Sequence, residues 1–431
     1  MKLSLRNIGK ISNAEVEING ITVIAGENNT GKSTIGKALY TLFNSFNNIE
    51  EKIIKEKENI IARYLIGRYR IFCPNERVVA PKIRSLIWFV SKEICVQSDK
   101  CINDINYLKN LLSPLFTNDA FDNELSDEDK NDILEKILFY LKITDDEIQK
   151  TVIENTLSEE FDSQVNNLNN KSERAIISLK FKNKEIDNID IQIINNRVET
   201  IKQYVSVFKN IVYIDNLFIL DQLNNRYGLI NSRDHQLDLL RMLDFKRDGS
   251  TTQIAIEQII VEKQLNLVLS KLNIVCDGEL ITENGVYKYS TPKFDEPLSL
   301  GNVSLGLKVF IILKTLLMNG SIEENGTIIL DEPETHLHPQ WQLKLAEVIV
   351  LLQKEFKLHI LLNTHSPYFL RAIETYSAKY EMADKCKYYL VSSENNLSIV
   401  EDVTTNTNKI YELLALSLNT LQNERWSLEN D

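Results

Sequence analysis

The 431-residue chain lacks the features that mark secreted, disulfide-bonded and membrane-spanning proteins. Its five cysteines are scattered, odd in number and never arranged as C-x-x-C, so they predict neither a disulfide framework nor a zinc site. The N-terminus alternates polar residues and does not resemble a secretion signal. No apolar run approaches the roughly 18 residues of a membrane span. These absences predict a cytoplasmic protein with reduced thiols and no membrane partner.

Repeats and linkers are missing as well. No internal repeat, low-complexity tract or Gly/Ser- or Pro-rich linker divides the sequence. At 431 residues the chain nevertheless exceeds what one core usually supports. Its apolar content of 43% and charged content of 26% are ordinary for a soluble globular protein. We therefore expect one continuous fold from which sizeable inserts emerge.

The chain has fewer Lys and Arg residues than Asp and Glu residues. The formal net charge of −12 argues against a protein that simply adheres to phosphate backbones. Locally, residues 52–84 carry nine Lys or Arg against three Glu, and residues 119–162 carry fifteen Asp or Glu against four Lys. This asymmetry fits a nucleic-acid face beside a self-repelling acidic one, and it fits ordinary solvated helix faces equally well. DNA therefore stays open as a partner.

The strongest motif is Gly26–Thr34, which fits G-x-x-x-x-G-K-[ST] without a gap. A short β-branched run at 20–25 predicts a buried strand before it, and apolar residues at helical spacing predict a helix after it. The helix N-terminus then offers free N–H groups and partial positive charge to nucleotide phosphates. We expect Lys32 to reach the β- and γ-phosphates and the Ser33 hydroxyl to bind Mg²⁺. The predicted phosphate-binding residues are Gly26, Asn28, Asn29, Thr30, Gly31, Lys32, Ser33 and Thr34.

The remaining chain alternates between strand-like and helical stretches. Residues 1–25 alternate like paired strands, and residues 46–160 are helical without the sustained heptad of a coiled coil. Capping boxes at Ser126–Asp129 and Thr144–Glu147 predict helix starts. Further strands are predicted at 175–181 and 189–193 as a hairpin, at 210–215, and at 278–289 as a hairpin around Asn284 and Gly285.

These elements predict five parts of the chain. They are an N-terminal lobe with the phosphate loop (1–45), a compact helical insert (46–172), a β part of the core (173–216), a second helical insert (217–275) and a C-terminal lobe (276–431).

A buried strand at 327–330 ends in the adjacent carboxylates of Asp331 and Glu332. Taken alone, four apolar residues followed by Asp-Glu are common, but together with a phosphate loop they are informative. In such a fold the first carboxylate, Asp331, holds Mg²⁺ directly or through water, and the second, Glu332, polarises the attacking water.

One helix later, the apolar strand at 360–364 leads to a single histidine, His365. A lone histidine is more often structural than functional. Here it follows Asp331 and Glu332 by one βα unit, where a γ-phosphate contact would fall, so a functional role is favoured.

A second candidate anion site precedes the apolar helix at 309–318. A small hydroxyl, a glycine and a lysine alternate at Ser304, Gly306 and Lys308. Because the chain already has one phosphate loop, these residues are interpreted as completing the pocket of another protomer. The alternative is an ordinary helix cap.

Along the chain, the phosphate loop is followed by the Ser304–Lys308 site, the strand ending in Asp331 and Glu332, and His365. These four elements in this order resemble the ATP-binding-cassette class of ATPases, in the branch that includes the SMC, RecF and OLD-like proteins. The runs Asp331–Pro339 and Asn363–Pro367 resemble the OLD/RecF-like members in particular. The resemblance covers residues 1–45, about 209–216 and 290–375, and hardly touches the helical inserts. Ser304, Gly306 and Lys308 match a Ser-x-Gly-x-Lys version of the signature motif. No glutamine matches the family's glutamine-bearing loop, where Asp215 or Asn216 stands instead.

The resemblance implies an α/β fold: a two-lobed ABC-type P-loop ATPase head with a mixed β-sheet and helical inserts. It implies ATP and Mg²⁺ between two head-to-tail protomers, in a homodimer or higher homo-oligomer. It also places the Thr335–Pro339 loop at the dimer interface. An alternative for that loop is a Zn or Mn cluster, formed by His336 and His338 with Asp331, Glu332 and Glu334.

Two functions follow from the resemblance. The stand-alone ATPases of bacterial anti-phage systems, of Septu and PARIS type, work with a separately encoded effector, commonly a nuclease. Only 66 residues run from Ser366 to the end of the sequence, and they lack an Asp-x-Asp pair, so we expect no nuclease in cis. The alternative is a RecF-like DNA-repair ATPase that closes on DNA with ATP, with the positive segment along the DNA path. A transporter subunit is disfavoured, because the inserts leave no obvious coupling groove.

Overall fold

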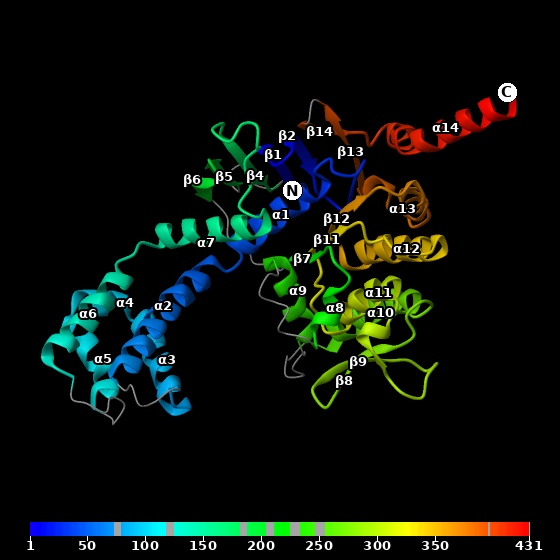
Figure 1. The fold of residues 1–431 in the computed structure, drawn as a ribbon. Helices are drawn as coiled ribbons and strands as arrows, with labels where there is room; N and C mark the ends of the chain where they lie inside the picture. The colour runs from blue at the N-terminus through cyan, green and yellow to red at the C-terminus, as the bar shows by residue number, and fades with distance from the viewer. Residues whose placement is uncertain are drawn as a thin grey trace. The chain divides into compact units, whose positions relative to one another are not determined.

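The computed structural model describes residues 1–72, 79–117, 125–181, 188–203, 211–224, 233–245, 255–394 and 397–430 (Figure 1). The chain forms two compact units. The main unit combines Met1–Asn47 with Glu154–Asp431, and the second unit is Asn48–Ile153. No helix within the described ranges is both long and apolar enough to cross a membrane.

The main unit is built on one eleven-stranded mixed sheet, with the order β6-β5-β4-β1-β2-β14-β13-β3-β12-β11-β7. Its centre is β3 (Ile21–Gly26), which is buried along its whole length between the parallel strands β12 (His359–Thr364) and β13 (Cys386–Glu394). Beyond β12 lie β11 (Thr327–Asp331) and β7 (Ile211–Ile214), again parallel. Parallel strands bring their carboxyl ends to one edge of the sheet. This edge therefore gathers the ends of β3, β11, β12 and β7.

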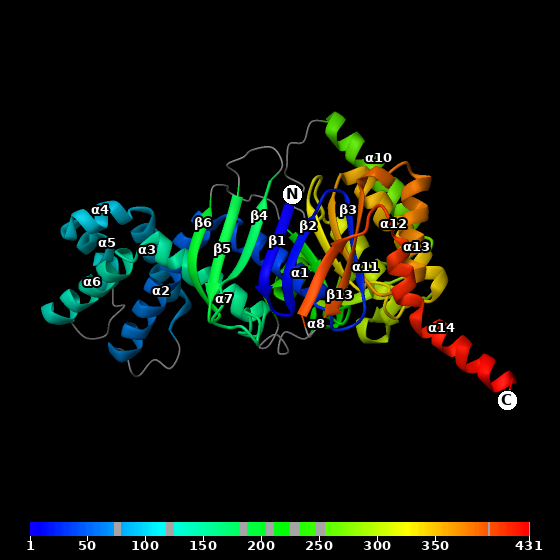
Figure 2. The ribbon, with the colours of Figure 1, turned by 90° about the horizontal axis from the view of Figure 1, so that it is seen from above.

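The other half of the sheet is antiparallel (Figure 2). It consists of β1 (Lys2–Ile8), β2 (Ile11–Glu17), β4 (Ala175–Lys180), β5 (Asn188–Ile194) and β6 (Arg197–Gln203). The strand β14 (Leu397–Asp402) joins the halves, because it pairs antiparallel with β13 and parallel with β2. The predicted α/β class with a mixed sheet is confirmed. The sequence pattern did not predict β6, an edge strand rich in charged residues.

Helices and a small sheet complete the main unit. The helices are α1 (Lys32–Phe46), α8 (Ile219–Gln222), α9 (Asp234–Asp244), α10 (Ala255–Leu272), α11 (Leu305–Met318), α12 (Pro339–Phe356), α13 (Pro367–Lys379) and α14 (Asn408–Asn430). The small sheet contains β8 (Glu279–Glu283), β9 (Val286–Ser290) and β10 (Leu298–Ser299), and its predicted hairpin turns at Asn284 and Gly285, both with positive φ. Short 3₁₀ turns are η2 (Leu300–Asn302) and η3 (Ala383–Lys385).

The boundaries of the two expected helical inserts differ from the structure. Residues 161–172, expected inside the first insert, lie with the sheet: the Asn166 amide donates to the carbonyls of Glu173 and Ile193. Residues 217–275, expected as a separate insert, contribute Leu220, Leu239 and Val268 to the core of the main unit. In both cases the tertiary partners, which local periodicity does not encode, decide where a segment packs.

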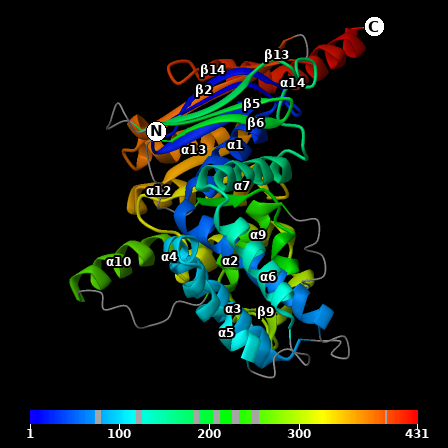
Figure 3. The same ribbon diagram turned by 90° about the vertical axis from the view of Figure 1, so that its left-hand side faces the viewer.

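The second unit is helical and has a core of its own. It contains α2 (Ile49–Phe72), α3 (Pro81–Val96), α4 (Ser98–Asn103), α5 (Ile105–Thr117), α6 (Asp127–Leu141) and most of α7 (Asp145–Glu160), which ends in the main unit (Figure 3). Buried Leu65, Ile87, Leu112 and Leu134 pack in its core. Both predicted capping boxes are present: Ser126 Oγ accepts from the Asp129 N–H at 3.1 Å and Thr144 Oγ1 from the Glu147 N–H at 3.3 Å.

Candidate active site

The glycine motif forms a tight loop between β3 and α1. Gly31 precedes the helix with φ of 91°, a conformation that favours glycine, and Asn29 has φ of 63°. A Cβ on Gly26 would lie 2.4 Å from the Val391 carbonyl oxygen, so only glycine fits where β3 meets β13. No side chain caps α1. The Thr34 N–H donates to the Gly31 carbonyl at 3.1 Å, and the N–H groups before it are the ones that the motif offers to an anion.

The Lys32 side chain lies inside this loop. It is buried, with 5% exposed, and its Nζ donates to the carbonyls of Gly26 at 3.0 Å and Glu27 at 2.7 Å. Thr30 is also buried, and its hydroxyl donates to the Glu27 carbonyl at 2.9 Å. These contacts hold the ammonium at the mouth of the loop. Phosphate oxygens bound by the loop would meet it there.

Asp331 lies at the end of β11 beside the loop. Asn363 Nδ2 donates to one of its oxygens at 2.9 Å and the Tyr213 hydroxyl to the other at 3.3 Å. Burial raises the pKa of Asp331, although hydrogen bonds from Ser33 and Asn363 oppose the shift. A carboxylate in this environment gains from a nearby cation. Asn363 Oδ1 is buried and has no hydrogen-bond partner among the described residues. A carboxylate, an amide oxygen and the Ser33 hydroxyl are oxygen donors that suit Mg²⁺.

Glu332 follows with a left-handed backbone at φ of 49°, which is uncommon for a residue other than glycine. Its Oε1 lies 3.3 Å from His365 Nδ1 and 3.6 Å from Lys32 Nζ. The interaction with His365 lowers the pKa of Glu332 despite burial, and the same interaction raises the pKa of His365. Glu332 is therefore held as a carboxylate, the form that accepts a proton from water.

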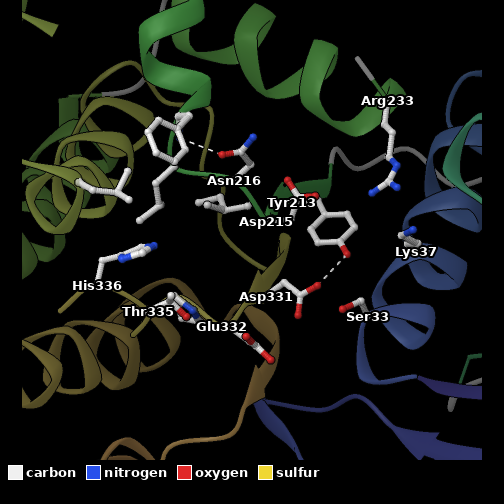
Figure 4. Close-up of a pocket in the computed structure, with 15 residues that line it drawn as sticks. Ser33, Lys37, Tyr213, Asp215, Asn216, Arg233, Asp331, Glu332, Thr335 and His336 are labelled. Carbon is white, nitrogen blue, oxygen red and sulfur yellow. Dashed lines mark hydrogen bonds between the residues drawn. The ribbon is translucent and has the colours of Figure 1, made fainter. Parts of the chain in front are cut away.

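A pocket of about 420 Å³ opens at this edge of the sheet (Figure 4). Figure 4 shows Ser33 facing Asp331, with the Tyr213 hydroxyl directed at Asp331 and Asp215 beside them. Lys37 and Arg233 supply positive charge on another wall. The complete lining is Ser33, Lys37, Tyr213, Ile214, Asp215, Asn216, Leu217, Phe218, Arg233, Leu305, Asp331, Glu332, Pro333, Thr335 and His336.

The predicted signature residues have three different environments. Ser304 precedes α11, is exposed, and makes no side-chain cap hydrogen bond, so the ordinary-cap alternative lacks its defining contact. A Cβ on Gly306 would lie 2.9 Å from the His336 carbonyl oxygen, so this glycine allows α11 to approach the loop after β11. Lys308 is 2% exposed and its Nζ lies 2.6 Å from both carboxylate oxygens of Asp221. Lys308 is thus committed to Asp221 and not presented to an anion.

The alternative metal cluster is not formed. Among the residues that the structure describes, no three His, Cys, Asp or Glu side chains gather to hold a metal ion. His338 instead caps α12, where its Nδ1 accepts from the Gln340 N–H at 3.3 Å. His336 has φ of 68° and lines the pocket.

Several contacts of the site were not predicted from the sequence. Buried Glu334 accepts from the Thr364 hydroxyl and from the His365 N–H, so it fixes the backbone that carries His365. Tyr213 and Asn363 contact Asp331. Tyr213 lies on β7, two residues before Asp215, which directly follows the strand. Positions two apart along an extended chain face the same side. That spacing is the signal from which Tyr213 could have been found.

The fold and the site define a P-loop ATPase: a phosphate loop, a desolvated carboxylate for a cation, and an ionised glutamate that contacts a histidine. Residues 1–370 match the family model described as AAA ATPase domain, and the chain belongs to that family. This membership confirms that the protein is an ATPase, as the motifs predicted.

Other comparisons are more distant. Over 165 residues the chain is 26% identical to Septu protein PtuA from Bacillus mycoides (strain KBAB4). That match covers 37% of this chain and 20% of PtuA, so the chain spans only about a fifth of the length of this relative. Among solved structures, an SMC head bound to the C-winged helix domain of ScpA matches with a TM-score of 0.42 at 12% identity, over 95% of this chain and 98% of that one. The SMC head domain from Thermotoga maritima matches with a TM-score of 0.39 at 13% identity, over 93% and 98%.

Proposed function

We propose that the chain binds ATP with Mg²⁺ in this pocket, closes into a head-to-tail homodimer or higher homo-oligomer, and controls a separately encoded effector of an anti-phage system, a nuclease. The observation that carries the ATP-dependent part is the convergence of Lys32, Asp331, Glu332 and His365 at one edge of the sheet. Their convergence joins the ends of three parallel strands that are far apart in the sequence.

Binding uses the loop and the residues beside it. The N–H groups at the start of α1 and the Lys32 ammonium receive the phosphates, and Thr34 and Asn28 complete the loop. Ser33, Asp331 and Asn363 hold Mg²⁺, which when bound neutralises charge on the phosphates. Asp331 favours the cation because its own charge is poorly solvated.

Hydrolysis depends on Glu332. As a carboxylate it accepts the proton of a water aligned with the γ-phosphate. His365, 3.3 Å from Glu332, orients that carboxylate and reports the presence of the γ-phosphate. Glu334 keeps His365 in place through its backbone N–H. Loss of the γ-phosphate then removes a contact that holds the closed state, so hydrolysis reopens the dimer.

Dimer closure uses Ser304. Its hydroxyl is exposed and makes no cap hydrogen bond at the start of the mostly buried helix α11, and it does not line the pocket of its own chain. A nucleotide held by a second copy would complete the contacts of this helix N-terminus. Lys308 has a supporting part, because its ion pair with Asp221 anchors α11.

The effector part of the proposal is supported by the match to Septu protein PtuA. The decisive experiment is native mass measurement of the chain, alone and mixed with the product of a neighbouring nuclease gene, with and without ATP. A dimer that appears with ATP, together with retention of the nuclease, supports the proposal. ATP-independent mass and no retained nuclease would refute it.

The second candidate, a DNA-repair ATPase, has one supporting observation. Arg63 and Arg70 are exposed along α2, whereas Arg68 is occupied by an ion pair with Asp132. If this function is correct, the purified chain alone binds DNA only with ATP, and the double variant Arg63→Glu/Arg70→Glu loses that binding. Under the first proposal the same variant leaves ATPase activity and effector retention unchanged.

A further inference from the structure

A buried histidine lies behind the wall of the pocket, in the first turn of α9. The His235 side chain is fully buried, with Nδ1 2.7 Å from Glu160 Oε2 and Nε2 3.0 Å from Asp215 Oδ2. Its ring stacks on Tyr213 at a centroid distance of 4.3 Å and an interplanar angle of 26°. Tyr40 of α1 contacts the same ring edge-on at 5.7 Å. One imidazole therefore touches three strands or helices besides its own.

Each partner of His235 has a second contact that matters. Tyr213 donates its hydroxyl to Asp331, and Asp215 lines the pocket, so both belong to the nucleotide site (Figure 4). Glu160 is the last residue of α7, and this helix begins at Asp145 within the helical unit. His235 thus joins Tyr213 of β7, and Asp215 directly after that strand, to the end of the helix through which the chain returns from the helical unit.

The charges of His235, Asp215 and Glu160 favour one another, and we call these three residues the ion triad. Burial lowers the pKa of His235, but Asp215 and Glu160 outweigh burial and raise it to about 9. Nδ1 hydrogen-bonds to Glu160, and Nε2 lies 3.0 Å from Asp215 without the geometry of a hydrogen bond, so the two carboxylates favour the positively charged imidazolium between them. The His235 backbone N–H donates to Glu160 Oε1 as well, at 3.1 Å. Removing the cation would leave two carboxylates without their partner in a buried site, which is strongly unfavourable.

We propose that His235 is a positioning residue of the ATPase site: it fixes Tyr213 and Asp215 against the pocket and fastens them to Glu160 at the end of α7. The inference rests on the proposed binding of ATP in this pocket. It adds a defined route by which nucleotide occupancy alters the end of α7. The alternative is a core ion triad that contributes only to stability.

The route acts through Asp331. Asp215 and Asp331 line the same pocket. His235 offsets the negative charge of Asp215. It also stacks on the ring of Tyr213, whose hydroxyl contacts Asp331. Without His235, the negative charge of Asp215 would lose its cationic partner, and the Tyr213 side chain that contacts Asp331 would be less constrained. We therefore expect catalysis to suffer more than nucleotide binding, because the phosphate loop itself is untouched.

The first test measures ATP turnover and binding of a fluorescent ATP analogue in His235→Gln and in the isosteric Glu160→Gln. Substitution of a residue that contacts a metal ligand typically lowers activity about 10–100-fold. We expect kcat to fall within that range in His235→Gln, and analogue affinity to stay within about twofold. In the double variant His235→Gln/Asp215→Asn, where both charges are gone, part of kcat should return. A kcat of the double variant that is equal to or lower than that of His235→Gln would overturn the proposal.

The matched control is Glu347→Gln. Glu347 is another buried carboxylate of the main unit, bound to Lys271, Lys379 and Tyr380, and it does not line the pocket. We expect it to lose thermal stability as the triad variants do, but to keep its kcat. If His235→Gln and Glu347→Gln behave alike, His235 is only structural. If the wild-type chain neither binds nor hydrolyses ATP, the proposed function itself fails, which is a distinct result.

The second test follows the end of α7 by hydrogen–deuterium exchange of residues 154–160. In the wild-type chain, ATP should change the exchange of these amides. In His235→Gln the change should disappear while the analogue still binds, and in Glu347→Gln it should persist. Unaltered exchange of residues 154–160 on ATP binding to the wild-type chain would overturn the proposed link.

Discussion

The Lys32 ammonium lies 3.6 Å from the Glu332 carboxylate, although Lys32 is near the start of the sequence and Glu332 is in its last third. The contact arises because β3 and β11 flank β12 in one parallel sheet, so the residues after each strand meet at the same edge. The two charges face each other at this edge of the sheet. Phosphates that enter the loop would replace Glu332 as the partner of Lys32 and release Glu332 toward water.

Lys32→Ala is expected to abolish ATP binding, because it removes the charge-assisted contacts to the phosphates. Isothermal titration with ATP and Mg²⁺ measures this directly. Lys10→Ala is the matched control: the exposed Lys10 also touches the loop, through the Asn29 carbonyl at 3.0 Å, and its loss should leave binding nearly unchanged. Undiminished ATP affinity in Lys32→Ala would remove the phosphate-loop assignment.

Glu332→Gln is expected to bind ATP normally and to hydrolyse it at least about 100-fold more slowly, because an amide cannot accept the proton of water. The same variant should accumulate the ATP-bound dimer. Phosphate release and size-exclusion chromatography measure the two effects. Glu324→Gln, at a surface carboxylate paired with Lys357, serves as the control and should retain full turnover. Normal turnover in Glu332→Gln would mean that another group is the base.

Ser304→Glu is expected to block ATP-dependent dimerisation and to leave ATP binding by the monomer intact. The added carboxylate would repel the phosphates of a partner's nucleotide, while Ser304 contributes nothing to the pocket of its own chain. Analytical ultracentrifugation with ATP tests the assembly, and titration tests the binding. Ser270→Glu, at an exposed serine of α10, should dimerise like the wild-type chain. Loss of ATP binding in Ser304→Glu would contradict the arrangement between protomers.

The local signals of the sequence were sufficient for the phosphate loop, both capping boxes and the hairpin at Asn284 and Gly285. Each depends on residues within a few positions of one another, and the structure contains each of them. The end-of-strand carboxylates could also be predicted, because a parallel sheet collects the residues that follow its strands. These features needed no knowledge of distant partners.

Long-range partners could not be predicted. Lys308 was interpreted as an anion ligand, but it pairs with Asp221, 87 positions away. Glu160 meets His235 across 75 positions, and neither residue belongs to a motif. A buried charge selects its partner through tertiary packing, and the spacing along the chain carries no trace of that choice.

The contacts of His235 with Asp215 and Glu160 should make the free energy of unfolding decrease as the pH rises into the alkaline range. Its pKa is about 9 in the folded chain, against an ordinary value of 6.5, because Asp215 and Glu160 outweigh the effect of burial. A raised pKa contributes stability that is complete below the unfolded value and is lost as pH rises through the folded value. This difference between the folded and ordinary pKa of His235 corresponds to about 3 kcal/mol of unfolding free energy, and this contribution should be lost between about pH 6.5 and pH 9.5.

Urea denaturation of the wild-type chain and His235→Gln over this pH range isolates the contribution of His235. The groups that face the imidazole or lie near it are common to both proteins: Asp215, Glu160, Tyr40, Tyr213, Lys37 and Arg233. The difference in unfolding free energy between the two proteins should therefore be largest at pH 6.5 and shrink toward pH 9.5. Glu347→Gln should show a difference that is flat over the same range, because the pKa of Glu347 is lowered and its carboxylate stays ionised throughout. A pH-independent difference for His235→Gln would show that the buried imidazole is not charged in the folded protein.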